Sequence, residues 1–148
     1  MIDIGSEESS IGKKLSNFSE FHFYVDDIFC ASMEGFLQSL KFSDPDKQVE
    51  ICKLVGVKAK FKGKKKKWYI NQKLYWKGKE IERDSIEYQD LLDKAFSELY
   101  KNSSYKSLLE QTKGHVLTHS IGKVNISETV LTIDEFCIRL MAMRDYNL

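Results

Sequence analysis

Proline and glycine are scarce in this chain, and their scarcity limits the folds that are open to it. Pro45 is the only proline, and eight glycines are spread over 148 residues. Because these two residue types most often interrupt helices and strands, the chain has few places for a linker. Hydrophobic residues make up 42%, enough for one core of ordinary size. We therefore expect a single domain over residues 15–148, preceded by a flexible N-terminal arm over residues 1–14.

A stripe of apolar residues predicts the first helix of this domain. Ser32 is a suitable N-cap, and apolar side chains follow it at spacings of three and four, at Met33, Phe36, Leu37 and Leu40. The predicted helix covers residues 32–42. Glu34, Gln38 and Lys41 lie together on a separate face of it.

Capping residues mark the remaining helices. Asp44, followed by Pro45 at the first helical position, predicts a helix that ends at Gly56. A shorter helix is expected over residues 103–110. The spacing of a capping box begins two further helices, at Asp84 with Glu87 and at Thr132 with Glu135.

Two short hairpins complete the expected architecture. Apolar and aromatic runs over 21–24 and 28–30 flank an acidic turn. A second hairpin is expected to run over 74–76 and to turn through Lys77, Gly78 and Lys79 into Ile81. The run from His115 to His119 is expected to be a strand or an extended loop. Together these patterns predict an α+β fold, mostly helical, with small antiparallel β-hairpins.

Positive charge is concentrated in one segment. Residues 57–79 contain ten lysines and neither Asp nor Glu, so this segment carries +10 and the rest of the chain −9, which sums to the net +1. One interpretation is a solvated loop whose aromatic residues turn into the core. The other is a surface that binds a polyanion such as nucleic acid, or a pyrophosphate, chiefly through Lys64, Lys65, Lys66 and Lys67.

Several classes of protein are excluded by the motifs that the sequence lacks. Gly63 is followed by four lysines without the order of a P-loop, and His115 and His119 lack the Glu of a zinc-protease helix. Three widely spaced cysteines indicate reduced, buried thiols. We expect no metal and no cofactor. Since no apolar run is long enough to cross a membrane and no secretory signal begins the chain, we expect a cytoplasmic protein.

Glu34 is the residue with the clearest chemical interest. It occupies the first turn of a helix whose neighbours are nearly all apolar, where a carboxylate is costly unless it is paired or used. An acidic residue in a first turn also interacts favourably with the helix dipole, which requires no chemistry. Both interpretations remain open on the pattern alone.

The chain resembles the NADAR (YbiA-like) family. The run Leu15-Ser16-Asn17-Phe18, an aromatic hairpin, and the block SMEGFLQSLKF over residues 32–42 are similar to the opening of that family, whose helix reads S-x-E-x-x-x-Q-x-x-K. Weaker similarity continues to Arg144. The resemblance implies a largely helical α+β fold and hydrolysis of N-glycosidic bonds to ribose, including removal of ADP-ribose from modified guanine in nucleic acid.

The resemblance also assigns roles to residues. Glu34 matches the catalytic glutamate of the family. Asn17, Gln38 and Lys41 match polar positions near that site and are candidate contacts to an ADP-ribose-type nucleotide or to ADP-ribosylated nucleic acid. Beyond the matched positions, Phe18 and Trp68 are candidates to stack on the base, and His119 is a further candidate contact.

One late motif of the family is changed. Where many members have Asp-x-x-Trp-Gly, this chain has His119-Ser120-Ile121-Gly122. Either His119 and Ser120 take over the ligand contacts, or the activity is altered or lost. The alternative to a hydrolase is therefore a non-catalytic module of the same fold that binds a nucleotide or nucleic acid. A third possibility is a structural interaction protein, in which Glu34, Gln38 and Lys41 would lie on a flat solvated surface.

Overall fold

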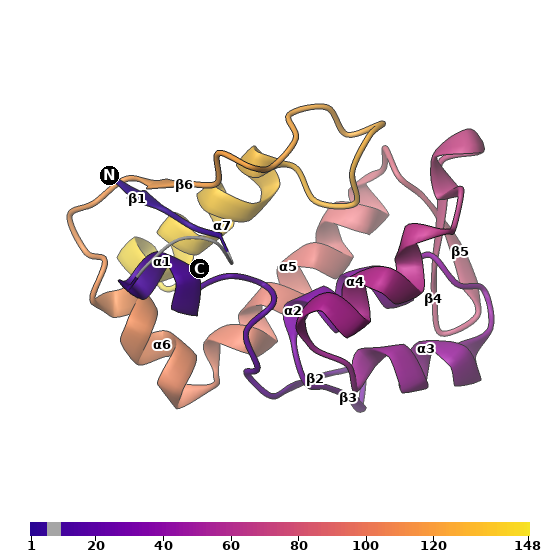
Figure 1. Cartoon of the computed structure of the whole chain (residues 1–148), viewed down its shortest axis with the longest axis horizontal. Coiled ribbons are helices and arrows are strands. Elements are labelled where there is room, and N and C mark those ends of the chain that lie inside the picture. The colour runs from indigo at the N-terminus through magenta and orange to yellow at the C-terminus, as the bar shows by residue number, and fades with distance from the viewer. Residues whose placement is uncertain (6–9) are drawn as a thin grey trace.

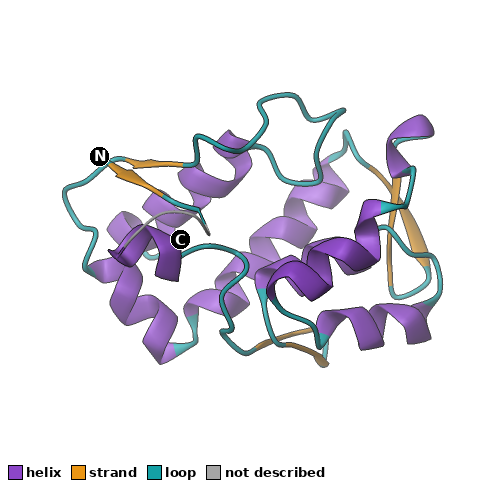
Figure 2. Cartoon of the chain, viewed as in Figure 1, coloured by secondary structure: helices purple, strands orange, loops and turns teal. Residues whose placement is uncertain are grey.

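The computed structural model describes residues 1–5 and 10–148 and is mostly helical, with three small strand pairs (Figures 1 and 2). The helices are α1 (Ser10–Lys14), α2 (Met33–Ser39), α3 (Pro45–Cys52), α4 (Gly56–Lys64), α5 (Ile86–Tyr100), α6 (Ser103–Glu110) and α7 (Ile133–Tyr146), with a 3-10 turn η1 (Trp68–Ile70). The strands are β1 (Ile2–Asp3), β2 (Phe23–Val25), β3 (Ile28–Cys30), β4 (Lys73–Trp76), β5 (Lys79–Glu82) and β6 (Leu117–Thr118). The expected α+β fold is confirmed.

Both predicted hairpins are present. β2 pairs antiparallel with β3 around Asp26 and Asp27, and β4 pairs antiparallel with β5 around Lys77 and Gly78. All four turn residues have positive φ, between 47° and 84°, as the tight two-residue turns of hairpins require. The indole N–H of Trp76 donates a hydrogen bond of 2.9 Å to Asp26 and so links the two hairpins.

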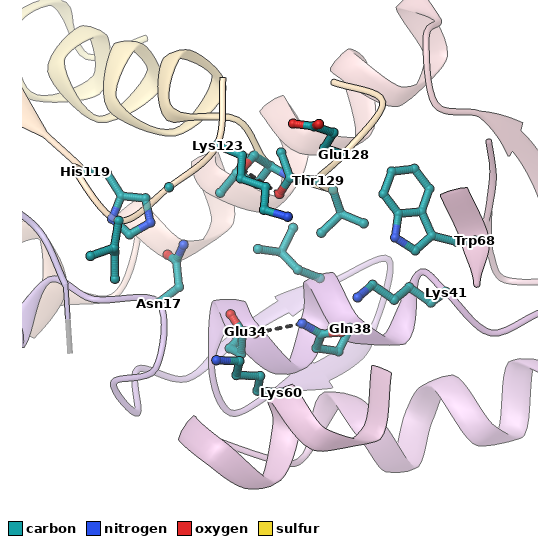
Figure 3. A pocket seen from close by; sticks show the side chains of 15 residues that line it. Asn17, Glu34, Gln38, Lys41, Lys60, Trp68, His119, Lys123, Glu128 and Thr129 are labelled. Carbon is teal, nitrogen blue, oxygen red and sulfur yellow. Dashed lines mark hydrogen bonds between the residues drawn. The ribbon is translucent and has the colours of Figure 1, made fainter. Parts of the chain in front are cut away.

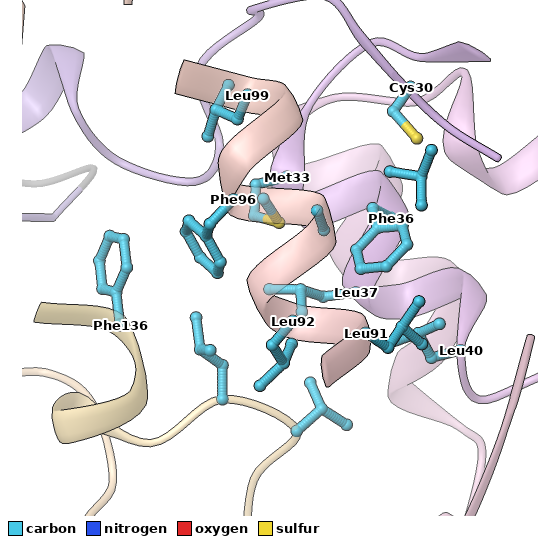
Figure 4. Packing of buried hydrophobic residues seen from close by; sticks show 14 of the residues in the cluster. Cys30, Met33, Phe36, Leu37, Leu40, Leu91, Leu92, Phe96, Leu99 and Phe136 are labelled. Atoms are coloured by element: carbon cyan, nitrogen blue, oxygen red, sulfur yellow. The ribbon is translucent and has the colours of Figure 1, made fainter. Parts of the chain in front are cut away.

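The core forms where α5 packs between α2 and α7. Figure 4 shows Phe36 and Leu37 of α2 facing Leu92 of α5, with Phe136 of α7 beside Phe96. All of these side chains are buried. The apolar stripe that predicts α2 is therefore its core face, and the separate face with Glu34 is turned elsewhere.

The first turn of α2 packs directly on the end of α3. A Cβ on Gly35 would lie 2.6 Å from the carbonyl oxygen of Leu54, so only glycine permits this approach. Ser32 caps α2 by accepting from Gly35 N at 3.0 Å, and its hydroxyl donates to Leu54 O at 2.8 Å. These contacts fix the end of α2 that carries Glu34.

Three predicted helix boundaries are wrong. The helix expected over residues 32–42 ends at Ser39. The helix that begins at Pro45 ends at Cys52, and Gly56, expected as its stop, instead begins α4 with φ of 56°. The cap of α5 is Ser85 and not Asp84, because the Ser85 hydroxyl accepts from Tyr88 N at 3.1 Å. The capping box of α7, with Thr132 and Glu135, is confirmed.

The described part of residues 1–14 packs on the domain, in contrast to the flexible arm expected there. β1 pairs in parallel with β6. The run from His115 to His119, expected to be a strand or an extended loop, thus contains a short strand. Ile4 is fully buried, and this apolar burial explains the difference. Residues 6–9 lie outside the described residues.

Candidate functional site

A cavity of about 350 Å³ lies between α2, α4 and the loop that follows β6 (Figure 3). Its wall includes most of the residues expected at a site, namely Asn17, Glu34, Gln38, Lys41, Trp68 and His119. The remaining lining residues are Leu37, Lys60, Ile121, Gly122, Lys123, Glu128, Thr129, Val130 and Leu131. The polar face of α2 therefore opens into a concave site and not onto a flat surface.

Glu34 is half-buried in the wall of this cavity, and its carboxylate is held by its own helix. Nε2 of Gln38 donates a hydrogen bond of 2.8 Å to Oε1 of Glu34. Burial raises the pKa of Glu34, while this hydrogen bond and the charges of Lys41 and Lys60 act in the opposite direction. The site thus places a carboxylate of raised pKa among cations, a combination common at functional sites.

Close packing against α4 fixes Gln38. A Cβ on Gly63 would lie 1.8 Å from Oε1 of Gln38, so a side chain at that position cannot coexist with this amide. Within the described part of the chain, Oε1 of Gln38 is buried without a hydrogen-bond partner, although its amide group donates to Glu34. Gln38 is therefore a contact of Glu34 in this structure, where the sequence predicts a contact to a ligand.

The imidazole of His119 has a defined orientation. Nδ1 lies 2.6 Å from the carbonyl oxygen of Ile4, and because a carbonyl only accepts, Nδ1 carries the proton. Phe136 packs edge-on against the ring at 5.3 Å between centroids. Gly122 leaves room for the imidazole, since a Cβ on residue 122 would lie 2.6 Å from Cδ2 of His119. The other ring nitrogen, Nε2, is then the atom available to the cavity.

Lysines from three parts of the chain line the cavity that holds this carboxylate. Lys41 comes from the end of α2, Lys60 from α4 and Lys123 from the loop after β6. Burial lowers the pKa of Lys41, and the charge of Glu34 opposes this effect. Figure 3 shows Trp68 and Lys41 at one side of the cavity and His119 at the other. A bound anion would therefore meet several amines within one site.

Comparisons with known proteins agree with this picture of the fold. The family described as Bacteriophage protein GP30.3 matches residues 9–145. The chain belongs to the bacteriophage GP30.3 family. A relative in Enterobacteria phage T4, the uncharacterized 17.1 kDa protein of the Gp30-rIII intergenic region, is 33% identical over 137 residues, which is 88% of each chain.

This member of the GP30.3 family also has a YbiA-like fold. The solved structure of the E. coli protein YbiA covers 98% of this chain and 85% of its own length with a TM-score of 0.61. The two sequences are 18% identical, so the likeness shows the fold alone. The α+β fold that the resemblance implied is thus confirmed.

Some predicted ligand contacts of this GP30.3 family member lie elsewhere. Phe18 is outside the described lining of the cavity, and its ring packs near Gly56 at the start of α4. Lys64 lies over the ring of Phe61 on the outer side of α4, 5.2 Å from its centroid. Neither Lys64 nor Lys65 lines this cavity or the second cavity that adjoins it. Lys66 and Lys67 line a second cavity next to the first.

Other residues of the site have only weak signals in the sequence. Lys60 lies in the lysine-rich segment, but without the helix α4 nothing distinguishes it from its neighbours. Lys123 and Thr129 belong to a loop that has no apolar period. Gly122 matches the glycine of the Asp-x-x-Trp-Gly pattern and is the one sequence signal in this loop. Its place beside His119 explains why a glycine is needed there.

No cluster of three or more His, Cys, Asp or Glu side chains suited to a metal ion occurs within residues 1–5 and 10–148. Over the same residues, every helix is too short or too polar to span a bilayer.

Proposed function

We propose that the protein is a hydrolase that cleaves an N-glycosidic bond to ribose. Its favoured substrate is nucleic acid ADP-ribosylated on guanine, from which it removes ADP-ribose. The observation that carries the proposal is the half-buried carboxylate of Glu34, held by Gln38 in a cavity that lysines surround. The resemblance of residues 15–42 to the NADAR family supports it, because Glu34 matches the catalytic glutamate of that family.

The carboxylate suits the electronic demand of the reaction. Hydrolysis breaks the bond between the anomeric carbon and the base nitrogen and forms a bond from that carbon to a water oxygen. The two protons of the water end on the new ribose hydroxyl and on the released base. As the bond to the base breaks, positive charge develops on the ribose, and the ionised form of Glu34 stabilises it.

Other side chains of the cavity supply binding and proton acceptance. Lys41, Lys60 and Lys123 are suited to the diphosphate of ADP-ribose. The indole of Trp68 forms part of the wall and offers an apolar surface to the base. In the neutral ring of His119, Nε2 accepts a hydrogen bond from the attacking water or from a ribose hydroxyl.

Turnover with a defined substrate tests this proposal. The purified protein is incubated with a single-stranded oligonucleotide ADP-ribosylated on guanine, and release of ADP-ribose is followed by mass spectrometry. We expect release by the unchanged protein and a fall of at least about 100-fold for Glu34→Gln, which keeps the shape and removes the charge. The matched control is Glu110→Gln at the exposed end of α6, with unchanged release.

A non-catalytic binding module remains the second candidate. It is favoured by the changed motif at residues 119–122, where Asp and Trp of the family pattern are absent from the sequence. Saturable binding of the modified oligonucleotide without release of ADP-ribose would establish this alternative. Undiminished hydrolysis by Glu34→Gln would instead remove Glu34 from the catalytic role.

A further inference from the structure

A second cavity, of about 220 Å³, adjoins the site of Glu34. Lys41 and Trp68 line both cavities, so the two are neighbours that share this wall. The rest of the second wall comes from the segment between α2 and α3, the link between α4 and η1, the residue after η1, and β4. These parts contribute Ser43, Lys66, Lys67, Asn71, Lys73 and Tyr75. The lysine-rich segment therefore builds a defined hollow beside the proposed active site.

The side chains of this second cavity are suited to an anion. It has four lysines in its wall and, among the residues that the structure describes, no carboxylate. Glu80 and Glu82 lie outside the wall and pair with Lys73, so the net positive charge comes from Lys41, Lys66 and Lys67. Nζ of Lys66 also lies 4.8 Å from the ring centroid of Phe42, a cation–π contact at the edge of this cavity.

Hydrogen-bond donors accompany this charge. Oδ1 of Asn71 accepts from Lys73 N at 3.1 Å, so the amide NH₂ of Asn71 is left as a donor. The hydroxyl groups of Ser43 and Tyr75 lie in the same wall. Several amines with neutral donors form an arrangement that binds phosphate oxygens.

We propose that this second cavity is a subsite for a backbone phosphate of the polynucleotide strand that carries the modified base. The inference rests on the proposed function. The first cavity already provides Lys41, Lys60 and Lys123 for the diphosphate of ADP-ribose, so a mononucleotide substrate leaves Lys66 and Lys67 without a phosphate. A strand that continues past the reacting nucleotide supplies one, and the shared wall of Lys41 and Trp68 connects the two positions.

The test compares two substrates that differ only in the strand. The double variant Lys66→Ala/Lys67→Ala is assayed on an ADP-ribosylated single-stranded oligonucleotide and on ADP-ribosylated guanosine, which has the diphosphate but no backbone phosphate. We expect kcat/KM on the oligonucleotide to fall about tenfold or more and kcat/KM on the nucleoside to stay unchanged. Equal losses on both substrates, or no loss on either, would overturn the assignment.

Control variants separate the subsite from general charge. Lys101→Ala/Lys113→Ala removes the same charge from exposed positions at and beyond the ends of α5 and α6, far from β4 in Figure 1. It is expected to keep oligonucleotide turnover. Lys66→Arg/Lys67→Arg retains both charges and is expected to restore most of it. Thermal melting of each variant checks that the fold is intact.

A binding measurement keeps the subsite testable if neither substrate is hydrolysed. Fluorescence anisotropy with an unmodified single-stranded oligonucleotide reports phosphate binding without turnover. The Lys66/Lys67 alanine variant is expected to bind about tenfold more weakly and to show a smaller dependence on salt. Each lost phosphate contact reduces the slope of log affinity against log salt concentration by about 0.7 in magnitude. Unchanged affinity together with an unchanged slope would overturn the subsite, whatever the outcome for hydrolysis.

Discussion

Nε2 of Gln38 donates a hydrogen bond of 2.8 Å to Oε1 of Glu34, four residues earlier on α2. This donor stabilises the ionised carboxylate and opposes the effect of burial, which raises the pKa of Glu34. Gln38→Met keeps the volume and removes the donor, so the pKa of Glu34 is expected to rise further. Carboxyl carbon NMR across a pH titration measures the shift directly, and the acid limb of hydrolysis should move to higher pH with it. An unmoved titration would contradict this role of Gln38.

Gly63→Ala tests the contact between α4 and the amide of Gln38. Since the added Cβ would lie 1.8 Å from Oε1 of Gln38, that side chain must move or the helices must separate. We expect a loss of about 1–3 kcal/mol in the free energy of unfolding, measured in urea, and weaker hydrolysis. Lys62→Ala, at an exposed position of the same helix, is the matched control and should leave both unchanged.

The buried ion pair between Arg83 and Glu135 predicts sensitivity to acid. Although burial acts in the opposite direction, hydrogen bonds from Arg83, Gln89 and Thr132 hold the pKa of Glu135 below its usual value of 4.5. A carboxylate with a lowered folded-state pKa stabilises the fold above its unfolded pKa and loses that contribution as the pH falls through the folded one. The free energy of unfolding should therefore decrease below about pH 4.5.

Glu135→Gln provides the comparison for this acid sensitivity. Removing one partner of a buried pair leaves the fully buried guanidinium of Arg83 without its carboxylate, so the variant should lose about 3–5 kcal/mol at pH 7. Its further loss between pH 5 and pH 3 should be smaller than that of the unchanged protein, by urea unfolding at each pH. If both proteins lose the same free energy of unfolding between about pH 5 and pH 3, carboxylates other than Glu135 determine the acid sensitivity.

Asp3 connects the first strand to the loop that bears His119. Its carboxylate accepts from Ser120 N at 2.8 Å and also from the Ser120 hydroxyl. Asp3→Ala should loosen residues 117–122, seen as faster amide hydrogen exchange, and should lower hydrolysis because the imidazole is then less fixed. Asp84→Ala, at an exposed position before α5, is the control. Unchanged exchange over this loop would remove the tethering role.

The parts of the site that the sequence predicts follow from helical period. Glu34, Gln38 and Lys41 are spaced by four and three residues, so a correctly predicted helix is enough to place them on one face. The sequence does not predict α4, because its residues Val57 and Phe61 are exposed and alternate with lysines, which hides any apolar stripe. Lys60 therefore has no predicted place in the site.

The other wall depends on contacts that no local pattern encodes. Lys123 and Thr129 lie in a loop without a period, and that loop is held in part by the bond from Gln72 to Ser127 O, 2.9 Å long. Phe18 follows Asn17 in the sequence, but adjacency does not fix which way an aromatic ring turns, and its ring lies near Gly56. The family resemblance points to residue 119, and the structure shows that Ile4 orients its ring.

The parallel pairing of β1 with β6 has a consequence for the order of assembly during translation. Ile2 pairs with Leu117, and Ile4 N donates to Thr118 O at 2.8 Å, so these early residues must wait for a partner made more than a hundred residues later. A nascent chain that has reached α6 already contains Glu34 and Gln38, but it has no imidazole wall facing them. The ribosome thus delivers the wall that carries His119 only after α2, α4 and η1 have been made.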